Sequence, residues 1–165
     1  MDATINPVYL LRAYAWAVLK ANMPDVWTET KYGGKEPIVP VAEEPDLDEY
    51  SGPHIVYGYA LNSTNVPLYA CKYGSMTLAV YDEDFRRLTK TMNVLQAAFE
   101  RQDEAARDIN HFTSARSQFI GLRFGSVAIG FVEGGTPESS EGGRQSALIN
   151  ITFDYYVDLD VITSV

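Results

Sequence analysis

The last part of the chain alternates apolar and polar side chains with a period of two. This alternation runs from Gln145 to Val157 and is expected for a strand with one buried face and one face in water. The apolar series is Ile149, Ile151, Phe153, Tyr155 and Val157, and the series between is Asn150, Thr152, Asp154, Tyr156 and Asp158. A loop rich in Gly, Ser and Glu precedes it, from Glu133 to Arg144. The pattern predicts a domain closed by a long C-terminal strand with a projecting loop beside it.

Near the N-terminus the apolar residues recur instead at helical spacing. They predict a helix from about Val8 to Ala21, with several alanines adding helix propensity. Pro7 suits the first turn, where its missing N–H costs nothing, and Pro24 ends the helix.

A second helical pattern begins near Phe85 and reaches about Arg101. Its apolar stripe consists of Phe85, Leu88, Met92, Leu95 and Phe99, which indicates an amphipathic helix whose apolar side is core and covers a sheet. Asp82 is a candidate N-cap, because its carboxylate can accept the first free N–H groups. Residues 102–111 either extend this helix or form a second, polar helix.

Alternation also predicts strands over residues 54–61 and 74–81, and strand character returns over 122–131. Glycines at 121, 125 and 130 indicate bends or bulges in the last of these. Residues 27–52 are rich in Pro and Gly, which predicts a long loop excursion with at most a short strand near Ile38 to Val41.

This order of elements predicts one α+β domain over residues 1–165. An N-terminal helix and a long central helix are expected to pack on a mainly antiparallel sheet. With 165 residues, 46% of them hydrophobic, the chain is long enough to bury about two thirds of its unfolded surface in one core.

Charge limits the partners of this protein. The net charge is −9, and one ten-residue stretch without a base holds Glu43, Glu44, Asp46, Asp48 and Glu49. Sustained binding of a phosphate backbone is driven by Lys and Arg, so an acidic surface suits nucleic acid only where DNA passes without sticking. The alternative is a solvated acidic loop that serves solubility.

The single cysteine, Cys71, excludes an intrachain disulfide framework and fits a reducing compartment. The N-terminus has no basic region followed by an apolar run, so no secretory signal is expected. The longest apolar stretch, Val8 to Leu19, contains Arg12 and is too short to span a bilayer. We expect a protein made in the cytoplasm that does not enter a membrane.

Catalytic chemistry has few candidate residues. His54 and His111 lack partners at metal-ligand spacing, and no phosphate-binding glycine motif or nucleophile elbow occurs. Cys71 lies beside Lys72, which could lower the pKa of a reactive thiol, but a positioned base is also required. We therefore expect a structural cysteine, no catalytic, cofactor or metal site, and no enzyme activity.

Arg86, Arg87 and Lys90 form the densest basic cluster, on the helix face opposite the apolar stripe. These residues are either solvated or meet an acidic surface on a neighbouring subunit. The acidic stretch that contains Glu43 and Glu44 is a candidate for that surface.

Two stretches of the chain resemble the tail-terminator family of tailed bacteriophages. They are Tyr-Asp-Glu-Asp-Phe-Arg-Arg-Leu at 81–88, after a strand, and Gly-Gly-Arg-Gln at 142–145, leading into Ala-Leu-Ile-Asn-Ile-Thr-Phe at 147–153. Together with the order of elements, the resemblance extends from Val8 to Val157. Members are small α+β domains with an N-terminal helix, a helix packed on a sheet and a C-terminal strand. The excursion after Trp27 is longer here than in minimal members.

The resemblance implies a structural virion protein at the head–tail junction. Copies would form a ring, usually a hexamer, that caps the tail tube and joins it to the head-side connector, while DNA passes through unbound. Expected partners are further copies of the chain, the tail tube protein, a neck or connector protein and, in a tail that has a sheath, the sheath protein. Expected interface residues are Arg86, Arg87, Lys90, Arg144, Glu43 and Glu44, and the exposed strand face or lumen would include Asn150, Asp154 and Asp158.

Two alternatives stay open at this level. One is another phage neck, sheath-contacting or baseplate component. The other belongs to a different class: a monomeric α+β domain that binds a ligand, or acts as an enzyme through Cys71 or His111.

Overall fold

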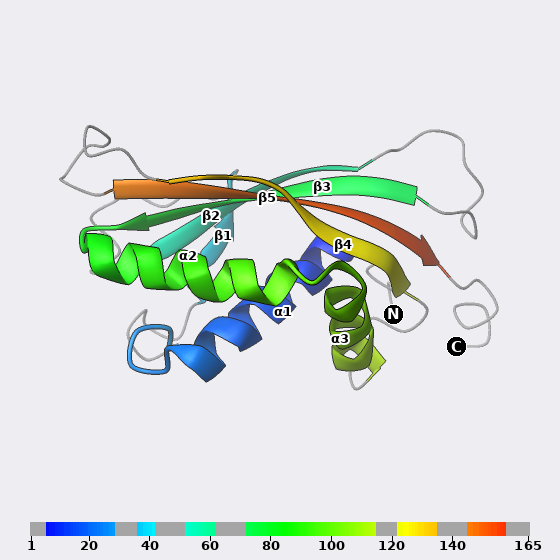
Figure 1. Cartoon of the computed structure of the whole chain (residues 1–165), viewed down its shortest axis with the longest axis horizontal. Helices are drawn as coiled ribbons and strands as arrows, with labels where there is room; N and C mark the ends of the chain where they lie inside the picture. The colour runs from blue at the N-terminus through cyan, green and yellow to red at the C-terminus, as the bar shows by residue number, and fades with distance from the viewer. Residues whose placement is uncertain are drawn as a thin grey trace.

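Helices and strands form two layers, with the helices gathered on one face of a single sheet (Figure 1). The computed structural model describes residues 6–28, 36–41, 52–61, 72–114, 122–134 and 145–157. In chain order, the elements in these ranges are α1 (Pro7–Asn22), β1 (Ile38–Pro40), β2 (His54–Leu61), β3 (Lys72–Asp82), α2 (Phe85–Phe99), α3 (Gln102–Ser114), β4 (Leu122–Glu133) and β5 (Gln145–Val157).

The predicted α+β class is confirmed, but the sheet is mixed and not mainly antiparallel as predicted. Its strand order is β1-β2-β3-β5-β4, so β5 is inserted between β3 and β4. β1 pairs with β2 in parallel, from Ile38 opposite Ile55 to Pro40 opposite Tyr57, while the other neighbours are antiparallel. Three residues are too few to show alternation, so the direction of β1 could not be predicted from the sequence.

The first helix begins and ends where its flanking residues predict. The Asn6 side chain accepts the Val8 N–H at 2.9 Å, Pro7 occupies the first turn, and the Met23 N–H bonds back to the Leu19 carbonyl. One side of α1 is buried, including Trp16, whose ring meets that of Trp27 edge-on at 6.5 Å. Trp27 is fully buried, so the predicted loop excursion starts with a core residue.

Two predictions for the second helix were wrong. Its N-cap is Asp84 and not Asp82: the Asp84 carboxylate accepts the N–H groups of Arg86 at 2.9 Å and Arg87 at 3.2 Å. Phe85 belongs to the predicted apolar stripe but is 56% exposed, because it is the first residue of the helix and lies beyond the core. The other stripe residues are buried, and α3 is a separate second helix, one of the two predicted possibilities.

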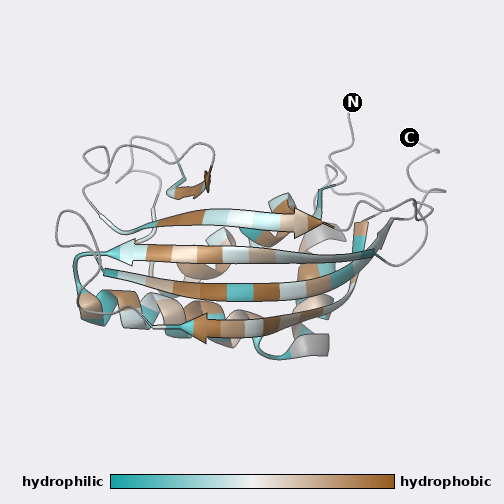
Figure 2. Cartoon of the chain, turned by 90° about the horizontal axis from the view of Figure 1, so that it is seen from above, coloured by the Kyte–Doolittle hydropathy of each residue, from teal (hydrophilic) through white to brown (hydrophobic). Residues whose placement is uncertain are grey.

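The sheet buries one face against the helices. Alternation along the strands is visible in Figure 2, where the sheet is seen from the side opposite the helices. α2 packs on β3 and β5, and α3 packs on β4. Residues of the central strands that reach the core include Met76, Leu78, Val80, Ile149, Ile151 and Phe153, all buried.

The predicted bulges in β4 are confirmed at two of its glycines. The pairing of β4 with β5 shifts register between Phe124 and Ser126, and again between Ile129 and Phe131. Gly125 and Gly130 are the extra residues at these shifts. The bulges change which β4 side chains reach the core and so shape the surface described next.

Candidate subunit interface

The sheet face opposite the helices carries small and polar side chains together with several larger ones. Register places on it, from the four long strands, the small or polar residues Gly58, Ala60, Ser75, Thr77, Ala79, Ser126, Ala128, Ser146, Asn150 and Thr152, and the larger residues His54, Val56, Tyr73, Tyr81, Phe131, Leu148 and Tyr156. Charged side chains on this face of the described strands are Arg123, Glu133 and Asp154. No described helix covers the face, as Figure 1 shows. We call it the outer sheet face.

Asp154 and Asn150, predicted to line a lumen or exposed face, lie opposite the two bulges. The Asp154 carboxylate accepts the N–H of Ser126 beside Gly125, and this side chain is half-buried, not exposed as predicted. The Asn150 amide donates to the Thr77 hydroxyl at 3.1 Å. Both side chains therefore support the sheet itself as well as facing outward. Asp158 lies outside the described residues.

Within the predicted basic cluster, Arg87 is engaged inside the chain. Its guanidinium donates to both oxygens of Asp82, from Nε at 2.8 Å and from Nη2 at 2.7 Å, and Asp82 is 1% exposed. Arg86 and Lys90 are exposed on α2 and remain candidates for contact with a neighbour. Arg144, Glu43 and Glu44 fall outside the described residues.

The outer edge of β4 is covered at one end and exposed at the other. The Asn110 side chain of α3 pairs with the backbone of Phe124 as a strand would, accepting its N–H at 2.8 Å and donating to its carbonyl at 2.9 Å. Toward the other end, Phe131 is 47% and Val132 39% exposed. This edge was not predicted from the sequence, although the two adjacent apolar residues that follow Gly130 at the end of the strand were a signal for it.

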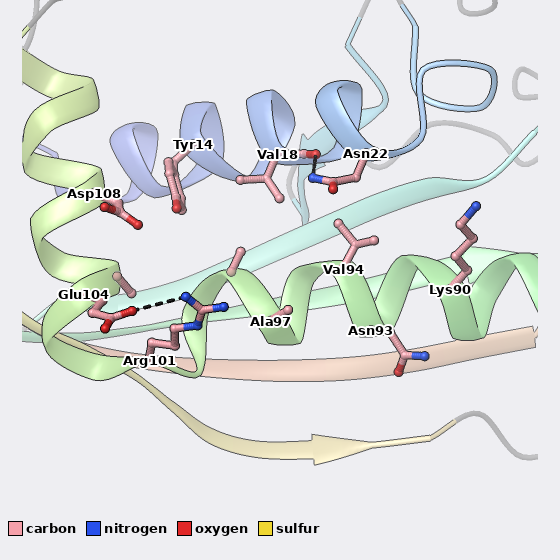
Figure 3. A pocket seen from close by; sticks show the side chains of 12 residues that line it. Tyr14, Val18, Asn22, Lys90, Asn93, Val94, Ala97, Arg101, Glu104 and Asp108 are labelled. Atoms are coloured by element: carbon pink, nitrogen blue, oxygen red, sulfur yellow. Dashed lines mark hydrogen bonds and ion pairs between the residues drawn. The ribbon is translucent and has the colours of Figure 1, made fainter.

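A groove of about 430 Å³ lies on the helical side, between α1 and α2, and α3 closes one end (Figure 3). Tyr14 and Val18 of α1 face Val94 of α2 across it, and Ala97 and Ala98 also line it. Lys90, Asn93, Arg101, Glu104 and Asp108 add polar groups to its lining. The groove is thus apolar between its walls and charged at both ends.

Tyr14 is the titratable group most affected by this groove. Burial raises the pKa of its phenol above 10.0, and the Asp108 carboxylate raises it further because a phenolate would be repelled. The ring packs edge-on against Phe99 at 5.7 Å and Phe112 at 5.9 Å. Tyr14 is therefore a neutral packing residue at neutral pH.

The two histidines lie in different surroundings. His54 is buried and stacks on Tyr81 with ring centres 5.1 Å apart, while His111 is exposed on α3. Cys71 lies outside the described residues. In the part of the chain that the structure describes, no three His, Cys, Asp or Glu side chains gather to hold a metal ion. No described helix is long and apolar enough to cross a membrane.

Comparison with known proteins adds no family assignment. No protein-family model matches the chain, and no curated protein matches it in sequence. The site must be interpreted from its own geometry.

Proposed function

We propose that this protein is a tail terminator: a structural virion protein whose copies form a ring at the head–tail junction of a tailed phage. The outer sheet face is the observation that carries the proposal. A sheet with helices on one side only presents a broad surface that a neighbour or a lumen can use.

The chemistry of the outer sheet face supports this role. Its side chains are mainly uncharged, and Arg123 is the one Lys or Arg that register places on it in the described strands. A surface poor in cations does not hold a phosphate backbone, so DNA could pass it during ejection. The net charge of −9 acts in the same direction.

A ring also requires one patch to meet a different patch on the next copy. Exposed Arg86 and Lys90 offer a basic patch, and the segment with Glu43 and Glu44 offers acidic groups. The partners of the ring would be the tail tube protein on one side and the neck or connector protein on the other, with sheath protein in a contractile tail.

Electron microscopy and light scattering of the purified protein test the proposal. We expect rings with a central hole of roughly duplex width, and rings that bind the ends of purified tail tubes. A protein that stays monomeric in the presence of tail tubes contradicts it. Another neck, sheath-contacting or baseplate role would give an assembly that binds a different virion part.

The groove favours a second candidate, a monomeric ligand-binding domain. A concave site of about 430 Å³ with apolar walls and polar ends is within the range of small-molecule sites. Such a protein would remain monomeric, and a small molecule would raise its melting temperature. Replacing Ala97 by Trp would fill the groove and abolish that shift.

A further inference from the structure

We propose that neighbouring copies of this chain join edge to edge, the last residues of β4 on one copy pairing with the last residues of β2 on the next. The inference rests on the proposed ring and names the contact that would build it. It starts from two segments at opposite edges of the sheet.

The first segment is the end of β2. β1 covers β2 from Ile55 to Tyr57 and no further, and among the described residues no strand lies beside Gly58 to Leu61 on that side. Tyr59, in the middle of this segment, is 49% exposed. The second segment is the end of β4, from Gly130 to Glu133, where every residue is exposed.

Both segments contain four residues and run in opposite directions. β2 is antiparallel to β3, β3 to β5 and β5 to β4, so β4 is antiparallel to β2. Rotation about a ring axis would bring β2 of one copy beside β4 of the next in this antiparallel sense. The sheet would then continue from copy to copy through the most frequent type of strand pairing.

One register fits the ends of both strands. β1 ends its cover at Tyr57, and β4 ends at Glu133, so Glu133 of one copy falls opposite Gly58 of the next. Val132 then lies opposite Tyr59, and Phe131 opposite Ala60. In this register the paired residues of the neighbour's β4 and of the chain's own β1 lie opposite different residues of β2.

The same register matches the faces of the sheet and the sizes of the side chains. Tyr59 pairs with Met76 and Val132 with Ile149, and both of these partners are buried on the helical side, so Tyr59 and Val132 would meet on one face. Pairs of an aromatic and a β-branched residue stabilise antiparallel strands. On the other face, the large Phe131 would cover the small Ala60.

This pairing also sets a tilt. Across one sheet Ala60 is in line with Ser75, Thr152 and Ala128, whereas the proposed contact places it opposite Phe131. Each copy would therefore be staggered along the strand direction relative to the last. A closed sheet needs such a stagger, because its strands must tilt against the axis.

A disulfide between Gly58→Cys and Glu133→Cys tests the contact, in a Cys71→Ser background that removes the native thiol. A side chain at Gly58 would meet no atom within 4 Å, so the substitution is tolerated. Within one chain the two positions are separated by three strand spacings, about 14 Å, which exceeds the reach of a disulfide, about 7 Å. Any disulfide must therefore join two copies.

We expect oxidation to convert more than about half of the chains into a ladder of linked species that returns to monomer on reduction. The control pairs Gly58→Cys with Asn93→Cys, an exposed position on α2 away from both edges. Rings that form but give no more cross-linking than the control overturn the edge contact and leave the ring intact. Monomers throughout overturn the ring as well.

A second variant tests the contact without thiols. Phe131→Lys places a charge on the β4 edge, the usual device by which exposed edges avoid pairing. We expect it to lose rings while retaining its circular dichroism and melting temperature. Tyr9→Lys replaces an aromatic side chain of similar exposure, 44%, on α1 and should leave rings unchanged. Normal ring yield from Phe131→Lys contradicts the proposed pairing.

Discussion

At the scale of single residues, the buried carboxylate of Asp82 is the most consequential polar group in the described structure. It ends β3, accepts two bonds from Arg87 and accepts the N–H of Asp84 at 3.0 Å. Asp84 in turn caps α2. One short sequence, Asp-Glu-Asp, thus fixes the angle at which the chain leaves the sheet and enters the helix.

Removing Arg87 and removing Asp82 are expected to destabilise the protein by different amounts. Arg87→Ala leaves a buried charge without its cation and should destabilise the protein by about 3–5 kcal/mol. Asp82→Ala leaves a guanidinium that is 34% exposed and can be hydrated, so about 1–3 kcal/mol is expected. Urea unfolding measures both. Arg86→Ala, at the exposed neighbouring residue, is the control and should change stability by less than about 0.5 kcal/mol. Equal losses of stability in Arg87→Ala and Asp82→Ala would contradict this prediction.

The raised pKa of Tyr14 predicts that the protein loses stability at alkaline pH. Its pKa in the folded state is raised by burial and by Asp108, so the unfolded chain loses the phenol proton at lower pH than the folded chain. The stabilising effect is fully present below about pH 10 and is lost as the pH rises through the folded pKa. Between about pH 9 and 11, the melting temperature of the parent should fall by a few degrees more than that of Tyr14→Phe.

Tyr73→Phe is the control for this comparison, because Tyr73 is 61% exposed on β3. Its melting temperature should follow the parent over the same pH range. Parallel curves for the parent and Tyr14→Phe would show that the buried phenol does not contribute.

At the scale of elements, alternation and helical spacing predicted β2, β3, β5, α1 and the body of α2, because the apolar residues of each recur with the period of that element. These patterns were insufficient at the ends of elements. Phe85 has the right spacing but occupies the first helical position. The short strand predicted near Ile38 to Val41 is present as β1, but three residues are too few to indicate its direction. The half-burial of Asp154 could not be predicted either, since it depends on a bulge in a strand that is a neighbour only in space.

Two strand glycines differ in the space available for a side chain, so replacing each by alanine should affect stability differently. A Cβ at Gly74 would lie 2.6 Å from Cζ of Phe153, whose ring is buried over the glycine, whereas a Cβ at Gly58 would meet nothing within 4 Å. Gly74→Ala should therefore cost about 1–3 kcal/mol. Gly58→Ala should be neutral or stabilising by up to about 1 kcal/mol, since it restricts the unfolded chain. Chemical unfolding of the two variants decides, and equal stabilities would contradict the packing argument.

At the scale of the whole molecule, the proposed function depends on surfaces of the sheet. The sequence alone pointed to an assembly protein through its charge and its lack of catalytic motifs. It did not locate the candidate edges of the sheet, because strand order determines which edges face outward. β5 lies between β3 and β4, and this insertion makes β4, and not the C-terminal strand, the edge opposite β2.

Charge pairing between copies provides the last prediction. Arg87 is bound to Asp82, so replacing Arg87 would affect both folding and assembly. Arg86 and Lys90 are exposed, so replacing them tests assembly alone. If they meet the segment with Glu43 and Glu44 on the next copy, Arg86→Glu with Lys90→Glu should weaken ring association about tenfold or more at low salt.

Salt dependence distinguishes this attraction from a steric effect. Exposed charges are screened over about 10 Å at 0.1 M salt and about 3 Å at 1 M, so the difference between the charge-reversed variant and the parent should shrink as salt rises. Arg86→Glu and Lys90→Glu are also made singly, and Arg107→Glu, which reverses one exposed charge on α3, is the matched control for each of them. Light scattering across a salt series measures ring yield. An equal loss of rings at every salt concentration, or an equally large loss in Arg107→Glu, would assign the effect to packing or to net charge. Either result would remove the basic patch from the interface. The edge contact between β2 and β4 is tested separately by its disulfide.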